Sequence, residues 1–183
     1  MVTDFIRARN VLKKRLEAIF DPEAFGLLYP EAEPTPKVYL GFPTTEPPFY
    51  AAIDEIVDVA TTTGAATMGH DTVSFTLHVW LSAQHTRLEA ASNALLCYID
   101  ALFGAVMADP QLNNTVENAF PQIESAGTAA DSSKRYIAAA LVGVECTVWS
   151  ACPASLQATV AAANAAFDED ETESEESNGS NGG

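Results

Sequence analysis

The order of apolar and polar positions divides the chain into segments of helical and strand periodicity. Residues 3–20 place apolar side chains at roughly helical spacing with basic residues between them, which predicts an amphipathic helix that begins near Thr3 or Asp4 and ends at Asp21-Pro22. Prolines then indicate an extended crossing, and the β-branched and aromatic run 37–42 predicts a short first strand. Residues 49–63 fit a helical turn or a strand, and we favour a strand, followed by a turn at 61–67.

The clearest strand covers residues 73–82, where apolar and polar positions alternate strictly. Val73, Phe75 and every second residue up to Leu81 form one apolar face, which we expect in the core. The opposite face is polar except for Trp80. That face is therefore either exposed to solvent or covered by a partner.

A long helix is predicted next, because apolar residues repeat at intervals of three and four until Asp109-Pro110. Thr86 and Glu89 have the spacing of a capping box at its start. We expect this helix to pack on the sheet. Residues 111–133 are rich in Asn, Gly and Ser around a possible short strand at 120–123.

The last strand is expected at 134–149, where both alternating faces are largely apolar. Such a strand lies either in the centre of a covered sheet or at a subunit interface. Residues 154–167 could form a short alanine-rich helix, and 168–183 is too acidic and too poor in apolar residues to fold. The pattern predicts one α+β domain at 1–153, with a mixed, mainly antiparallel sheet, one long helix packed on it and the N-terminal amphipathic helix.

Charge narrows the classes of partner. The chain of 183 residues has a formal net charge of −16, and seven acidic residues fall within 168–176. An acidic body repels phosphate backbones and anionic lipids, so we expect no direct nucleic-acid binding and no membrane binding. No apolar run approaches the roughly 20 residues of a bilayer span, and no signal sequence is evident, so we expect a protein made in a cytoplasm.

A local basic patch on the first helix is the exception to this acidity. One interpretation is a solvated helix face, and the other is an electrostatic contact with an acidic neighbour. The five residues of the patch are Arg7, Arg9, Lys13, Lys14 and Arg15.

Candidate chemistry is sparse. His70, Asp71, His78 and His85 match no metal-ligand spacing, and surface histidines explain them better. The three cysteines, Cys97, Cys146 and Cys152, are interpreted as reduced core residues without a nearby base. No nucleophile elbow, phosphate-binding loop or dinucleotide fingerprint occurs. We therefore expect no catalytic residues, no metal, no cofactor and no enzymatic activity.

Aromatic residues on the strands have two interpretations. Core or half-exposed packing within the sheet is one, and an oligomer interface is the other, because apolar residues on a face that would be wet in a monomer often mark association surfaces. The candidate interface residues are Trp80, His78, Tyr136 and Trp149.

The order of these elements resembles the tail terminator proteins of long-tailed bacteriophages over residues 1–150. The likeness includes the basic helix, the proline-rich crossing, the strand 38–43, the strand 74–81 ending in Val-Trp-Leu, the long helix and the strand 136–148. It implies a subunit that forms a homo-hexameric ring on the tail tube in the neck of the virion. Such a ring stops tube polymerisation and meets a head-completion or connector protein. The alanine-rich segment and the acidic tail after Pro153 depart from the pattern.

Three alternatives remain open at this point. The chain could be another neck or head-completion subunit, a small enzyme with an unrecognised site, or a monomeric binding module whose acidic tail mimics nucleic acid. The mass of the protein in solution separates a ring from a monomer.

Overall fold

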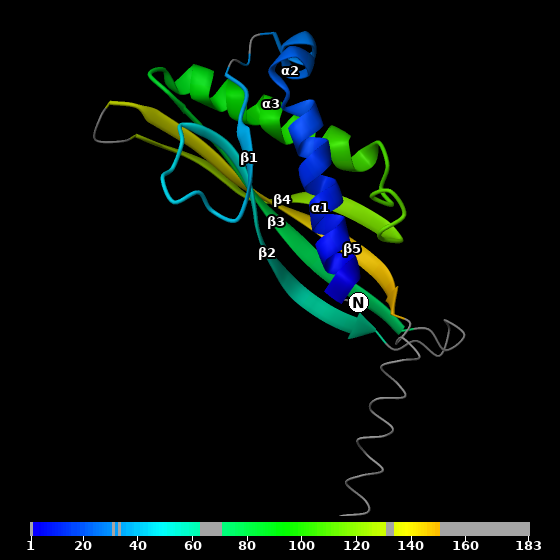
Figure 1. Ribbon diagram of the computed structural model, residues 1–183. Coiled ribbons are helices and arrows are strands. Elements are labelled where there is room, and N and C mark those ends of the chain that lie inside the picture. The colour runs from blue at the N-terminus through cyan, green and yellow to red at the C-terminus, as the bar shows by residue number, and fades with distance from the viewer. Residues whose placement is uncertain (1, 31, 33, 63–70, 131–133, 151–183) are drawn as a thin grey trace, which may run out of the picture. The chain divides into compact units, whose positions relative to one another are not determined.

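The fold is a five-stranded sheet with helices packed on one face, as Figure 1 shows for the computed structural model. The structure describes residues 2–30, 32, 34–62, 71–130 and 134–150. A compact unit comprises residues 1–150, and a second segment begins at Ala151. The predicted helix at 154–167, the predicted tail at 168–183 and most of the turn at 61–67 lie outside the described residues.

The sheet order is β1-β2-β3-β5-β4, in which β1 pairs with β2 in parallel and the other neighbours are antiparallel. The mixed, mainly antiparallel sheet and its long helix confirm the predicted fold class. The strands are β1 (Lys37–Leu40), β2 (Phe49–Thr62), β3 (Asp71–His85), β4 (Asn118–Ala130) and β5 (Tyr136–Ser150).

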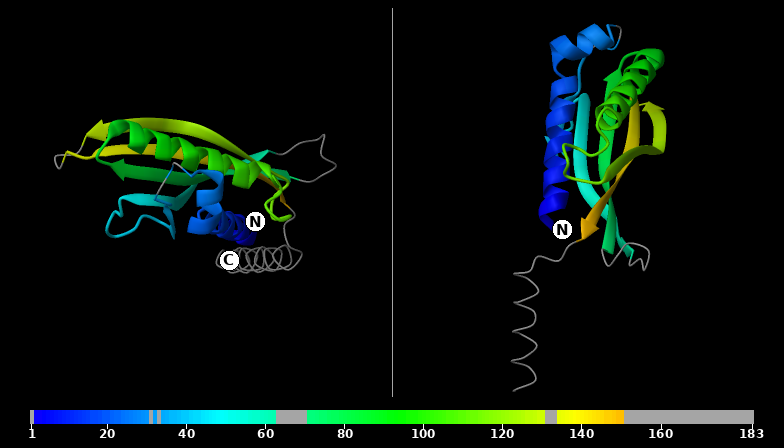
Figure 2. Two further views of the ribbon diagram at one scale, coloured as in Figure 1. Left: turned by 90° about the horizontal axis from the view of Figure 1, so that it is seen from above. Right: turned by 90° about the vertical axis from the view of Figure 1, so that its right-hand side faces the viewer.

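Three helices accompany the sheet: α1 (Val2–Ile19), α2 (Pro22–Leu28) and α3 (Leu88–Met107). Helix α1 lies in front of the twisted sheet, and α3 crosses behind α1 (Figures 1 and 2). The Phe5 ring of α1 contacts Phe75 of β3 with centroids 4.3 Å apart, so α1 packs on the same core face that the alternation of β3 predicts. Tyr98 of α3 is fully buried and meets Phe20 and Phe25.

Helix α3 begins one residue later than the capping box requires. Its N-cap is Arg87, which has extended backbone angles and makes no side-chain cap hydrogen bond. Leu88, the first residue of α3, is 46% exposed. The prediction of a Thr86–Glu89 capping box is therefore wrong, because residue 87 takes the position that the Thr86 hydroxyl would need.

Helix α3 is the one helix of the described residues that could cross a bilayer by length and composition. Half of that apolar stretch is nevertheless buried within the fold. The central helix of a water-soluble domain has the same composition, because it is covered by other elements along much of its surface.

The strand β5 lies between β3 and β4, and only one of its two apolar faces is buried. Its even-numbered residues from Ala138 to Val148 are buried beneath the helices. The strand β4 extends far beyond the expected 120–123. From Gln122 to Ala130 every residue is exposed, so neither helix covers this part of the edge.

Candidate functional site

The face of the sheet opposite the helices, here called the open face, holds three of the four predicted interface residues. His78 and Trp80 point to it from β3. Trp149 of β5 pairs with Thr72, which lies on the same face of β3 as His78, so Trp149 lies on the open face as well. Tyr136 pairs with His85 and packs against the core on the helix side. The four residues therefore do not form one surface, since alternation places Tyr136 on the opposite side of β5 from Trp149.

Distance along the strands also separates the two tryptophans. The partner of Trp149 is eight residues from Trp80 on β3, which corresponds to roughly 26 Å at 3.3 Å per residue. Trp149 is 48% exposed and lies at the end of the open face close to Asp71. The open face therefore has two separate aromatic positions.

Trp80 is partly covered by a residue from the loop between β1 and β2. The Phe42 ring lies 5.7 Å from the Trp80 ring, and Phe42 itself remains 48% exposed. Trp80 is flanked in the sheet by Ala52 and Leu141, and the small Ala52 is completely buried. The pair Phe42–Trp80 is therefore an apolar patch of mixed origin, half packed and half exposed.

His78 lies between two carboxylates on the open face. Its Nε2 is 3.1 Å from Glu124 Oε1 of β4, and its Nδ1 is 3.8 Å from Glu55 Oε1 of β2. The strand β5 separates β3 from β4, and the residue opposite His78 there is Gly143. A Cβ at Gly143 would collide with Glu124 Oε1, so the missing side chain allows Glu124 to reach across β5. The cluster links β2, β3 and β4.

Desolvation acts on the carboxylate beside this cluster. Partial burial raises the pKa of Asp54, the neighbouring Glu55 raises it further, and His78 opposes both. The arrangement can hold a proton or position a cationic group. No cluster of three potential metal ligands occurs within the described residues.

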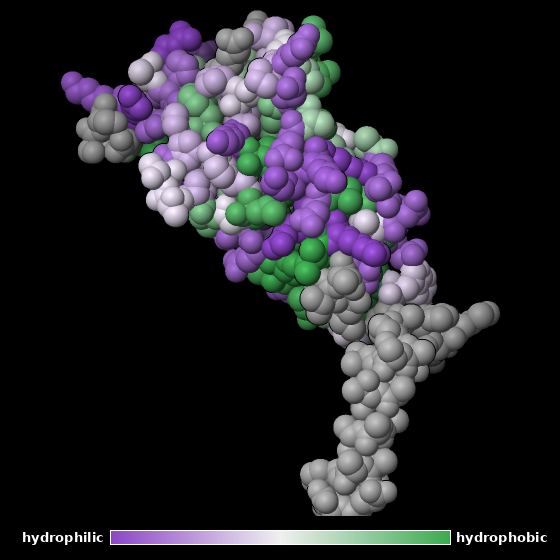
Figure 3. All heavy atoms as spheres, in the orientation of Figure 1, coloured by the Kyte–Doolittle hydropathy of each residue, from purple (hydrophilic) through white to green (hydrophobic). Residues whose placement is uncertain are grey.

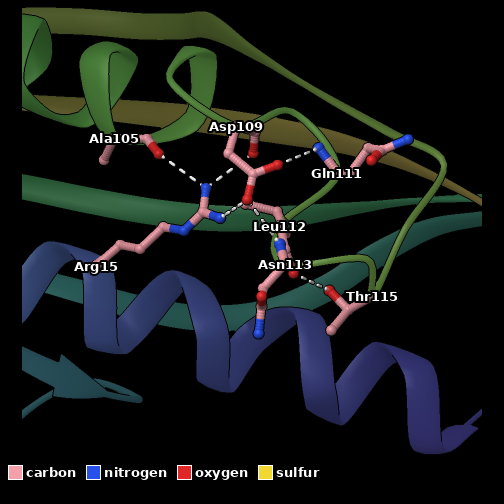
Figure 4. Close-up of polar contacts among 7 residues, drawn as sticks. All are labelled: Arg15, Ala105, Asp109, Gln111, Leu112, Asn113 and Thr115. Atoms are coloured by element: carbon pink, nitrogen blue, oxygen red, sulfur yellow. Dashed lines mark hydrogen bonds and ion pairs between the residues drawn. The ribbon is translucent and has the colours of Figure 1, made fainter.

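The predicted basic patch divides into residues with different roles. Arg15 binds within the fold: its guanidinium donates to the main-chain carbonyls of Ala105 and Asp109 and pairs with the Asp109 carboxylate (Figure 4). The Asp109 carboxylate also accepts from the backbone N–H groups of Gln111 and Asn113. Hydrogen bonding from Asn113 and then Arg15 lowers the pKa of Asp109. Arg15 therefore closes the C-terminal end of α3 onto α1.

The other four residues of the patch lie closer to solvent. Lys13 pairs with Glu17 one turn later at 2.6 Å, and the Nε of Arg9 is buried without a hydrogen-bond partner in the described part of the chain. Arg7 and Lys14 are exposed. Figure 3 shows hydrophilic side chains along the outward side of α1. The surface available for an electrostatic contact is thus centred on Arg7 and Lys14.

Several hollows lie in the described surface. One of them has a volume of about 510 Å³ and is lined by one side of α3, including Glu89, Asn93 and Cys97. Elsewhere Thr86 Oγ1 lies 3.5 Å from His85 Nδ1, which is too long for an activating hydrogen bond. Burial raises the pKa of the Cys146 thiol to about 12, so that thiol is unreactive. Cys152 lies outside the described residues.

Sequence patterns alone did not reveal several residues of this surface. Glu124 was not recognised because its strand was expected to end at 123, and Gly143 carried no signal within an apolar strand. Phe42 could have been noticed as an aromatic residue directly before Pro43 in a loop.

Comparison with protein-family models finds no match, and comparison with curated proteins finds no relative.

Proposed function

We propose that this chain is a virion structural protein similar to a phage tail terminator. In this role it forms a ring, with six copies as the expected number, on the end of the tail tube. The ring stops tube polymerisation and provides the surface on which a head-completion or connector protein joins the tail. Its place would be the neck of the virion.

The observation that carries the proposal is the one-sided cover of the sheet. Helices α1 and α3 pack on one face, whereas the opposite face presents the Phe42–Trp80 patch and Trp149. Exposed apolar side chains gathered on a sheet face that no helix covers are typical of association surfaces. A ring subunit needs two such surfaces that complement each other, because its contacts are heterologous.

Charge supports an assembly role as well. Arg7 and Lys14 are exposed on α1 of a chain whose net charge is −16. A basic helix surface on an acidic subunit can steer the approach of an acidic neighbour. The order of the elements also supports the proposal, because it resembles that of tail terminator proteins. It comprises a basic first helix, a proline-rich crossing and a long helix between the two central strands.

The direct test measures tube length. Purified tail tube protein of the same virus is polymerised with and without this protein, and tube lengths are measured by electron microscopy. We expect short tubes of uniform length, each with a ring at one end. Tubes that grow to the same length with and without the protein would contradict the proposal.

A charge variant refines this test. Arg7→Glu with Lys14→Glu should slow attachment to the tube and make it more sensitive to salt, while the subunit stays folded in a thermal melt. Lys37→Glu with Arg87→Glu changes the net charge equally at two exposed positions outside α1 and is the matched control. Equal attachment by both variants would remove α1 from the contact.

A further inference from the structure

The two sides of the sheet end in edges of opposite character. On one side, β4 pairs only with β5, so its outer edge has no neighbour among the described residues. On the other side, β1 covers β2 only from Tyr50 to Ile53, which leaves Asp54–Thr62 without an outer strand in the described part of the chain. Figures 1 and 2 show that the C-terminal end of β4 and the C-terminal end of β2 lie at opposite ends of the sheet.

The last six residues of β4 lack the devices that normally protect an edge strand, whereas Pro121, Glu124 and a bulge at Ile123/Ser125 protect its first part. From Ser125 to Ala130 the strand has no charged residue and no proline, and its pairing with β5 runs without a register shift. All six residues are exposed. Natural edge strands avoid pairing with other chains by charges, prolines or bulges, so an unprotected edge of this kind indicates a surface that is covered in the assembled state.

Two cations accompany this edge. Lys134 and Arg135 are exposed at the start of the return to β5. The segment 125–135 contains these two basic residues and one acidic residue, Asp131, in a chain of net charge −16. It is therefore a locally positive edge on an acidic protein, and it can approach an acidic surface without repulsion.

The uncovered part of β2 is the complementary acidic edge. Glu55 and Asp58 are exposed there, and Asp54 is partly exposed. Register shifts at Ile53/Ile56 and Val57/Ala60, with a positive φ at Asp58, interrupt this strand. Bulges and like charges oppose the pairing of two β2 edges with each other. A neutral edge followed by cations avoids the repulsion of like charges, and the bulges of β2 limit backbone pairing with it to short stretches.

We propose that the β4 edge of one subunit, Ser125–Ala130 with Lys134 and Arg135, docks on the β2 edge, Asp54–Thr62, of a second copy of this chain. The contact joins opposite edges and opposite ends, so it is heterologous and can repeat from subunit to subunit around a closed ring. Short stretches of backbone pairing form between the bulges, and the cations on Asp54, Glu55 and Asp58 set the orientation. This inference deepens the proposed ring and rests on it for closure, but self-association through these edges is measurable by itself.

The test uses charge reversal and rescue in the full-length chain. One variant is Lys134→Glu with Arg135→Glu, and the other is Asp54→Lys with Glu55→Lys. Each alone should weaken self-association about tenfold or more in analytical ultracentrifugation, as loss and reversal of two close charge pairs implies. An equimolar mixture should recover association, because each reversed edge then meets its complement. Lys37→Glu with Arg87→Glu, which shifts the net charge equally, should associate as the unmodified chain does.

The outcomes separate this contact from the ring function. If the unmodified chain forms rings that cap tubes while both reversed variants assemble normally, the edge contact is wrong and the tail function stands. If each variant loses association and the mixture recovers it, the edge contact is right. If, in addition, the unmodified chain does not change the length of the tubes, the tail function is wrong. Failure of the mixture to recover would also overturn the pairing of these two edges. Thermal melts identify any variant that does not fold. In that case the chain with all four substitutions, in which the two edges exchange their charges, is measured instead and is expected to self-associate.

Discussion

At the scale of single residues, Arg15 shows how a side chain that looks like surface charge can hold two helices together. Its guanidinium reaches across from α1 to the last turn of α3 and binds two carbonyls and a carboxylate (Figure 4). The carbonyls at the end of a helix lack partners within the helix. Arg15 supplies donors to them, so its charge serves the fold.

We expect Arg15→Ala to lower the free energy of unfolding by about 2 kcal/mol, because two charge-assisted bonds to main-chain carbonyls are lost. Lys14→Ala, the exposed neighbour on the same helix, should change it by less than about 0.5 kcal/mol. Urea denaturation followed by circular dichroism measures both. Equal effects would mean that the Arg15 contacts contribute little in solution.

The same contact predicts a pH dependence at the acid end. The pKa of Asp109 is lowered in the folded chain, so as the pH falls the unfolded chain takes up the proton first. The stabilisation is therefore full above the ordinary aspartate pKa of about 4 and is lost as the pH falls toward the lowered value. In Asp109→Asn, melting temperature should depend less steeply on pH in this range than in the unmodified chain.

At the scale of elements, the sequence predicts those strands and helices whose burial pattern is regular. β3 alternates without interruption and was located correctly, since every second residue from Val73 to Leu81 is buried. β2 was ambiguous because two register shifts break its alternation. β4 was mostly missed, because Ser, Ala, Gly and Thr have weak strand preference and its extended form depends on pairing with β5.

The candidate site could be predicted only in part for the same reason. His78 and Trp80 were placed on one face by alternation within a single strand. The link from His78 to Glu124 depends on β4 lying two strands away, beyond β5, and no local pattern contains that topology. Tyr136 and Trp149 lie on the same strand, and alternation alone already places them on opposite faces of the sheet.

The absence of a side chain at Gly143 is expected to matter mainly because of Glu124. Gly143→Ala should lower stability, since the new Cβ displaces the Glu124 carboxylate from His78 and also approaches Thr76. In a Glu124→Ala background the same substitution should cost less or even stabilise, because alanine restricts the unfolded chain more than glycine does. A double-mutant cycle by denaturant titration gives the coupling. Additive effects would show that the two side chains do not meet.

The start of α3 gives a prediction that can raise stability. Arg87 occupies the N-cap with extended backbone angles and no capping side chain, so Arg87→Ser should stabilise the chain by about 0.5–1 kcal/mol. Thr86→Ala should have almost no effect, because its hydroxyl does not cap the helix. Melting temperatures of the two variants decide this. A large drop in the melting temperature of Thr86→Ala would show that the Thr86 hydroxyl does cap the helix, and would contradict Arg87 as the N-cap.

At the scale of the whole molecule, the two tryptophans separate packing from association. Trp80 is half-buried against Phe42, whereas Trp149 is 48% exposed. Trp80→Ala should therefore destabilise the subunit. Trp149→Ala should destabilise the subunit less than Trp80→Ala does, and should weaken assembly by about 2 kcal/mol if that residue anchors a contact. Thermal melts beside light scattering measure both quantities, and unfolding of Trp149→Ala would place that side chain in the core.

The central pairing of the sheet has a consequence for how fast the chain folds. β3 and β5 run side by side over their whole lengths, yet their paired residues are roughly 50 to 80 positions apart in the sequence. The chain must close that loop, with α3 and β4 inside it, before the hydrogen bonds and side-chain contacts of the central ladder can offset the entropy lost in closing it. We therefore expect folding in milliseconds to seconds rather than microseconds. A newly synthesised chain cannot complete its central pair until β5 has left the ribosome, and the apolar face of β3 stays exposed until then.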